Sequence, residues 1–170
     1  MTNEIAWYLP SDLLSRSLDV MRPQGALGNE GLAFWLGQQA GDDVKVTHMV
    51  SIVGAGIRHA PLQLRVSLAA MEALTNLVER VGSHLVGQIH SHPARMLDLS
   101  DVDKTYGIRI QNYLSLVCPH YAQVAAINHC DCGVHLFDQG HYRRLNSEEV
   151  RRRVHMSRTP VACISLEVSK

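Results

Sequence analysis

The stretch that decides the fold is His90-Ser91-His92-Pro93, followed after six residues by Ser100-Asp101-Val102-Asp103. We predict a strand over residues 84–92, which Pro93 ends. Side chains at positions i and i+2 of a strand share one face, so both imidazoles can point at the same place. The loop after Pro93 can then bring Asp103, in the first turn of a helix, to that place.

Two imidazoles and one carboxylate are typical of a catalytic zinc site that leaves its fourth position to water. Zinc lowers the pKa of such a water towards about 7, and a carboxylate is suited to move its proton as general base. Each part also has a simpler interpretation. A His-x-His strand usually carries solvated or hydrogen-bonded histidines, and Ser100-x-x-Asp103 has the pattern of a helix capping box. The combination at this spacing is far more specific than its parts, and a cap at Ser100 is compatible with a site there.

The composition indicates an ordinary globular protein. The chain has 170 residues, of which 46% are hydrophobic and 19% charged, which predicts one domain and argues against disorder. Sixteen basic residues balance sixteen acidic ones, so nucleic acid and anionic membranes are not expected as partners. Ten histidines are a high number of the side chain that most often ligates metals.

The cysteines and the apolar segments point to the cytoplasm. Four cysteines, at positions 118, 130, 132 and 163, are too few for a disulfide scaffold. The first ten residues lack a basic segment followed by an apolar one, and no apolar run reaches about 18 residues. We therefore expect reduced thiols and a cytoplasmic protein that does not cross a membrane.

The element order predicts an α/β fold with a mixed sheet flanked by helices. The clearest helix covers residues 67–81, with Ser67 as N-cap and Gly82 just beyond its end. A helix over residues 11–22, capped by Ser11, is expected to stop at Pro23. Residues 54–65 are expected to be irregular. Further helices are predicted over residues 101–111 and 147–155, and strands over residues 3–9, 31–36, 44–53, 113–117, 123–128, 134–138 and 161–166.

The motif at residues 90–103 resembles that of the JAB/MPN (JAMM) zinc metalloproteases at every defining position. This family also carries a glutamate before an apolar, glycine-containing run on an early strand. The run Glu30-Gly31-Leu32-Ala33-Phe34-Trp35-Leu36-Gly37 is similar, with Ala33 where a glycine is common. The resemblance covers about residues 11–145. It implies a single MPN-like domain over residues 1–158, followed by a C-terminal tail or edge strand over residues 159–170.

The resemblance also implies roles for individual residues. His90, His92 and Asp103 are expected to hold one Zn²⁺ per chain. Glu30 is expected to act as general base and then as general acid to the leaving amine. Ser100 is expected to help stabilise the oxyanion of the tetrahedral intermediate. No covalent enzyme intermediate is then required.

The substrate class likewise follows from the resemblance, which implies a zinc isopeptidase or peptidase. Such enzymes cut after the C-terminal tail of a ubiquitin-like protein or release it from a conjugate. The short connection at residues 117–122 leaves little room for the insertion of lysine-63-selective deubiquitinases, which favours a compact prokaryotic-type member. A bacterial ubiquitin-like or antiphage conjugation system would then supply the partners. The alternatives are a non-hydrolytic binding or scaffold module for a ubiquitin-like partner and a sulfur-carrier tail peptidase.

Two further patterns have open interpretations. His129-Cys130-Asp131-Cys132, followed by His135, supplies ligands for a second zinc or forms a hairpin turn with incidental thiols. Arg143-Arg144 and Arg151-Arg152-Arg153 form either a solvated basic face or a docking patch for an acidic partner surface.

Overall fold

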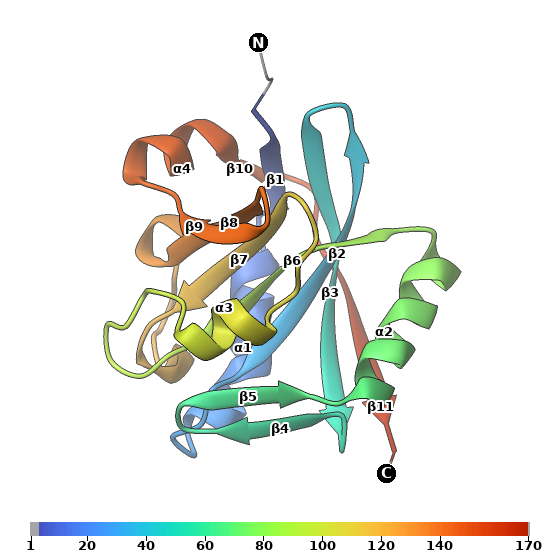
Figure 1. Ribbon diagram of the computed structural model, residues 1–170, viewed down its shortest axis with the longest axis vertical. Coiled ribbons are helices and arrows are strands. Elements are labelled where there is room, and N and C mark those ends of the chain that lie inside the picture. The colour runs from blue at the N-terminus through green and yellow to red at the C-terminus, as the bar shows by residue number, and fades with distance from the viewer. Residues whose placement is uncertain (1–3, 170) are drawn as a thin grey trace.

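In residues 4–169, which the computed structural model describes, nine strands form one branched sheet with helices on both faces (Figure 1). The strand order is β10-β1-β3-β2-β6-β7-β8-β9, and β11 pairs in parallel with the second half of β3. The strands are β1 (Ala6–Pro10), β2 (Leu32–Ala40), β3 (Asp43–Gly54), β6 (His84–Ser91), β7 (Tyr113–Cys118), β8 (Gly133–Asp138), β9 (His141–Arg144), β10 (Val154–Ser157) and β11 (Ala162–Val168).

The sheet is mixed in direction. β2 runs antiparallel to both β3 and β6, whereas β6 and β7 are parallel neighbours. A separate antiparallel hairpin, β4 (Ile57–Ala60) and β5 (Gln63–Val66), lies at the lower edge of the view in Figure 1. This architecture confirms the predicted α/β class with a mixed sheet flanked by helices. Residues 1–3 and 170, which belong to the predicted ranges 1–158, 159–170 and 3–9, lie outside the described residues.

An apolar core lies on each of the two faces of the sheet. Helix α1 (Leu13–Gly25) packs on one face with Trp7 and Trp35, and α2 (Leu68–Val81) packs on the other against Phe34. Two short helices, α3 (Asp101–Tyr106) and α4 (Ser147–Arg153), and two 3-10 turns, η1 (His120–Ala122) and η2 (His129–Asp131), complete the fold. The α2 face is the one that carries the candidate site.

Local sequence signals were sufficient for the best-capped elements. Ser67 caps α2 by accepting a hydrogen bond from the Ala70 amide, and Gly82 ends the helix in the left-handed conformation, as predicted. Strand β6 begins at His84, also as predicted. The strand predicted over residues 134–138 corresponds to β8.

Four local predictions are wrong for identifiable reasons. Helix α1 starts after Asp12 rather than Ser11, and it continues past Pro23 because a proline in the last turn removes only one donor. Residues 123–128 form no strand, since the Arg22 guanidinium binds the carbonyls of Val124 and Ala125 that a ladder would use. Helix α3 ends at Tyr106 because the next residue is extended. Residues 54–65 contain the β4–β5 hairpin instead of irregular chain.

Candidate metal centre and its cleft

The two histidines come from the end of a central strand. His90 lies in β6, opposite Leu32 of β2, and is 2% exposed. His92 follows the last residue of β6, and its amide donates to the Cys118 carbonyl of β7 over 2.9 Å. The spacing of two therefore turns both imidazoles to the same side, where their Nε2 atoms lie 3.0 Å apart.

Asp103 reaches these nitrogens because Ser100 starts helix α3. The Ser100 hydroxyl accepts from the Asp103 amide over 3.1 Å and donates to Asp103 Oδ2 over 2.7 Å, and the Ser100 amide also donates to Oδ2. The predicted capping box is thus present, and its carboxylate is the candidate ligand. Burial opposes ionisation of this carboxyl, but hydrogen bonds from His90, His92 and Ser100 outweigh it and hold the pKa of Asp103 far below its usual range.

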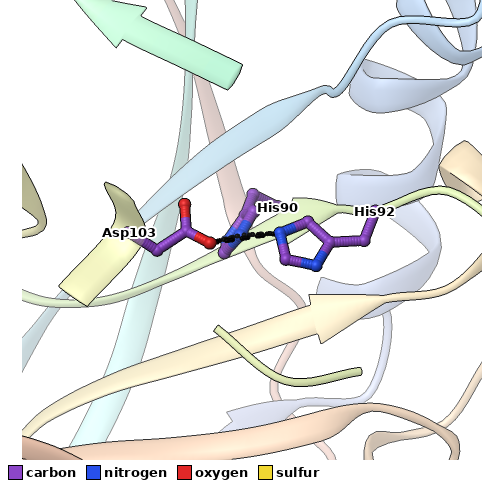
Figure 2. A group of neighbouring side chains, drawn as sticks. All are labelled: His90, His92 and Asp103. Atoms are coloured by element: carbon purple, nitrogen blue, oxygen red, sulfur yellow. Dashed lines mark hydrogen bonds and ion pairs between the residues drawn. The ribbon is translucent and has the colours of Figure 1, made fainter. Parts of the chain in front are cut away.

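The three side chains present their ligand atoms to one point. Asp103 Oδ2 lies 3.2 Å from His92 Nε2 and 3.6 Å from His90 Nε2, and Figure 2 shows the Asp103 carboxylate facing His92 across the edge of His90. All ligand atoms lie within 4.8 Å of one another, which within residues 4–169 occurs for this group alone. Two neutral imidazoles and a carboxylate fit a divalent metal that keeps an open position.

Glu30 lies beside this cluster, although it is 60 residues away in the sequence. Its carboxylate is 4% exposed and approaches His92 Nε2 to 3.7 Å. The neighbouring residue, Gly31, is bound to Ser91 twice: its amide donates to the hydroxyl over 2.8 Å and its carbonyl accepts from the amide over 3.0 Å. Burial raises the pKa of Glu30 to about 7, more than the proximity of His92 lowers it.

A large cleft opens onto the cluster. Its volume is about 1020 Å³, and its floor is formed by Leu32 and Phe34 of β2 and by Gln88 and His90 of β6. Helix α2 and strand β5 form one wall, and α3 with the segment after it forms the other. Of the candidate site residues, His90 and Asp103 line this cleft, whereas His92 and Glu30 do not.

The second cysteine- and histidine-rich stretch does not converge. Cys130 is exposed in η2, Cys132 is buried in the core, and His135 lies on β8 with its Nε2 3.8 Å from Asp98. Asn128 and Asp131 form a capping box around η2. The turn with incidental thiols is therefore the better interpretation of this stretch.

The basic residues of the C-terminal part are largely paired within the chain. Arg143 contacts Glu149 at 2.7 Å, and Arg144 contacts Asp98 at the same distance. Arg152 binds Glu4 through two hydrogen bonds. These pairs favour a solvated, self-neutralised face over a docking patch for an acidic partner.

Sequence reasoning missed two residues that support the site. His59 of β4 binds the Glu30 carbonyl through Nδ1 over 2.7 Å. Tyr121 donates its amide to the His92 carbonyl and its hydroxyl to the Pro61 carbonyl, both over 2.8 Å. Neither residue belongs to a motif, and both contacts join segments far apart in the chain, so no local spacing could have indicated them.

The fold and the site together define a metal-binding α/β protein. Its candidate ligands, two histidines and an aspartate, are of the types that hold the metal in zinc hydrolases. No protein-family model matches the chain. The chain is 31% identical over 117 residues to the probable metalloprotease y4jG of Sinorhizobium fredii (strain NBRC 101917 / NGR234), an alignment that covers 68% of this chain and 72% of that protein. The chain therefore belongs to the family of this probable metalloprotease.

The structure is also similar to that of protein DSY2949 from Desulfitobacterium hafniense, a structural-genomics target solved in solution. The TM-score is 0.61 at 19% sequence identity, over 91% of this chain and 94% of that one. At this identity the likeness shows the shared fold alone. No helix in residues 4–169 is both long and apolar enough to span a membrane.

Proposed function

We propose that the protein is a zinc peptidase of the JAB/MPN (JAMM) type that cuts after the C-terminal tail of a ubiquitin-like protein. The observation that carries the proposal is the convergence of His90, His92 and Asp103 beside the buried carboxylate of Glu30. Membership in a family with a probable metalloprotease supports the hydrolytic class. One Zn²⁺ per chain fits a set of two imidazoles and one carboxylate.

The residues of the site have separate roles in the proposed reaction. His90, His92 and Asp103 would hold the zinc, which when bound supplies Lewis-acid catalysis and a nucleophile at neutral pH. Glu30 takes a proton from the attacking water at its buried carboxylate and returns it to the leaving amine. Ser100 orients Asp103 through its 2.7 Å hydrogen bond. We also assign the Ser100 hydroxyl to the oxyanion; because it has a single proton, that role requires it to turn away from Asp103 as the oxyanion forms.

The cleft supports a peptide tail as the ligand. In the described part of the chain β5 pairs with β4 alone, so its other edge offers free backbone groups to an extended segment. On the opposite wall, Tyr106 is 82% exposed and Val102 and Ile110 are 36% and 45% exposed. An apolar rim of this kind suits a folded protein attached to the tail. A ubiquitin-like protein or its conjugate combines both features, with conjugation enzymes as further partners.

The test uses the purified protein and a lysate of its own host. We expect new protein C-termini, detected by mass spectrometry after a glycine-containing tail, to appear with the wild-type chain. They should be absent with a zinc chelator and with Glu30→Ala, which should still bind one zinc. Glu79→Ala, which changes an exposed glutamate on α2, is the matched control and should cleave normally.

Three results would contradict parts of this proposal. Normal cleavage by Glu30→Ala would remove Glu30 as the base. Zinc binding without any cleavage would favour a non-hydrolytic binding or scaffold module. Cleavage of short tail peptides as fast as of folded conjugates would indicate a tail peptidase, such as one that processes a sulfur carrier.

A further inference from the structure

The backbone of Glu30 is held from two sides. On the side of β6, Ser91 binds Gly31 through two hydrogen bonds. On the other side the β4–β5 hairpin contributes two more contacts: the Glu30 amide donates to the Ala60 carbonyl over 3.0 Å, and the Glu30 carbonyl contacts His59 Nδ1 at 2.7 Å. The His59 contact is the one of these four that uses a side chain from outside the central sheet.

We propose that His59 is a positioning residue for Glu30, which rests on the proposed role of Glu30 as general base. A carbonyl oxygen only accepts hydrogen bonds, so Nδ1 of His59 carries the proton in this contact. The imidazole fixes the Glu30 peptide plane, and with it the direction in which the side chain leaves the backbone. His59 does not reach the metal ligands and is not a catalytic residue.

The position of the hairpin explains why this contact matters for the reaction. Strand β5 forms part of the cleft wall, and two residues of β4, His59 and Ala60, contact the backbone of Glu30. One two-stranded unit therefore contacts both the tail cleft and the base. Since His59 itself does not line the cleft, its loss should affect the rate of the chemical step more than substrate binding.

The hairpin has other anchors that keep it in place without His59. The Tyr121 hydroxyl donates to the Pro61 carbonyl at the hairpin turn, and the Ala60 contact uses backbone atoms only. His59→Ala should therefore fold and bind one zinc. His59→Asn restores a donor near the position of Nδ1 and serves as the rescue variant.

The first readout does not depend on activity. In His59→Ala the Glu30 carbonyl loses its hydrogen bond from Nδ1, so we expect the carbon-13 resonance of this carbonyl to shift upfield from its wild-type position in the NMR spectrum. His59→Asn should return this resonance close to its wild-type position. His141→Ala is the matched control, because His141 also contacts a carbonyl through Nδ1, that of Gln139, at an exposed place on β9.

The second readout is the split between kcat and KM on the substrate that the lysate experiment identifies. His59→Ala should lower kcat by about 10- to 100-fold while KM changes by less than about three-fold, as for a misplaced catalytic group. His59→Asn should recover most of kcat. An unchanged Glu30 carbonyl resonance, an unchanged kcat, or no rescue by asparagine would each overturn the inference. A wild-type chain without cleavage would instead overturn the proposed function, and an unchanged Glu30 carbonyl resonance in His59→Ala would still overturn the His59 contact.

Discussion

Two stretches of the chain offer similar residue types and reach opposite results. Residues 90–103 bring His90, His92 and Asp103 within 4.8 Å of one another. Residues 129–135 contain two histidines, two cysteines and an aspartate, yet their side chains point to different surroundings. Richness in metal-ligating residues therefore does not by itself predict a metal site.

The difference lies in the backbone that carries each stretch. In the first, a strand with a spacing of two and a capped helix aim three side chains at one point. In the second, a 3-10 turn places Cys130 in solvent, while Cys132 joins the core and burial raises its pKa well above the usual value. The two thiols therefore lie in different surroundings, and they belong to no converging group of ligands in residues 4–169.

The largest expected effect is on metal content. His90→Ala removes a ligand from the converging group, so the purified variant should retain less than about a tenth of the wild-type zinc after dialysis. Cys130→Ser changes the exposed thiol of the second stretch and should retain one zinc per chain. Elemental analysis of the two variants decides this, and equal loss of zinc in both would contradict the assignment.

A smaller effect is expected from the cap of α3. Ser100→Ala and Ser67→Ala each remove a serine that caps a helix, so each should lower the free energy of unfolding by about 1 kcal/mol. Only Ser100 also binds the carboxylate of Asp103, so only Ser100→Ala should weaken zinc binding, by about 10- to 100-fold. Competition with a chromogenic chelator measures the affinity, and equal affinities of the two variants would show that Ser100 acts as a cap alone.

An effect on stability alone is expected from His135 of the second stretch, which is 3% exposed. Burial lowers the pKa of His135 to about 4, with a further contribution from Arg144, below its ordinary value of 6.5. In the unfolded chain His135 therefore binds a proton below about pH 6.5, whereas in the folded chain it binds one only below about pH 4. Between pH 7 and 5 this should cost on the order of 2 kcal/mol of folding free energy.

Denaturant unfolding at the two pH values tests this, with His135→Gln as the variant that cannot titrate. The wild type should lose more stability than His135→Gln on going from pH 7 to 5. The same loss in both proteins would show that His135 is not held neutral by the fold. His141→Gln, at an exposed histidine, should behave as the wild type.

How much of the site could be predicted depended on how far apart its residues lie in the sequence. Because His90, His92 and Asp103 lie within 14 residues, strand alternation and a capping box were sufficient to bring them together. Glu30 was expected from a resemblance alone, and its position depends on contacts with Ser91 and with the hairpin. His59 and Tyr121 could not be predicted, since their contacts exist only once distant segments have packed.

The fold shows the same division. Helix α2 was predicted nearly to the residue because Ser67 and Gly82 mark its ends. Pro23 was misleading because a proline near a helix C-terminus costs few hydrogen bonds. The β4–β5 hairpin was missed because each of its strands has only four residues and because Pro61, which lies between them, is also typical of irregular chain. Residues 123–128 were mispredicted because a distant arginine, Arg22, binds carbonyls that a strand would need.

X-ray absorption at the zinc edge of the zinc-loaded protein tests the central claim most directly. A metal held by His90, His92 and Asp103 should show only nitrogen and oxygen neighbours, at about 2.0–2.2 Å, with outer-shell scattering from imidazole rings. A sulfur neighbour at about 2.3 Å would place the metal on the cysteines of the second stretch and would contradict the assignment.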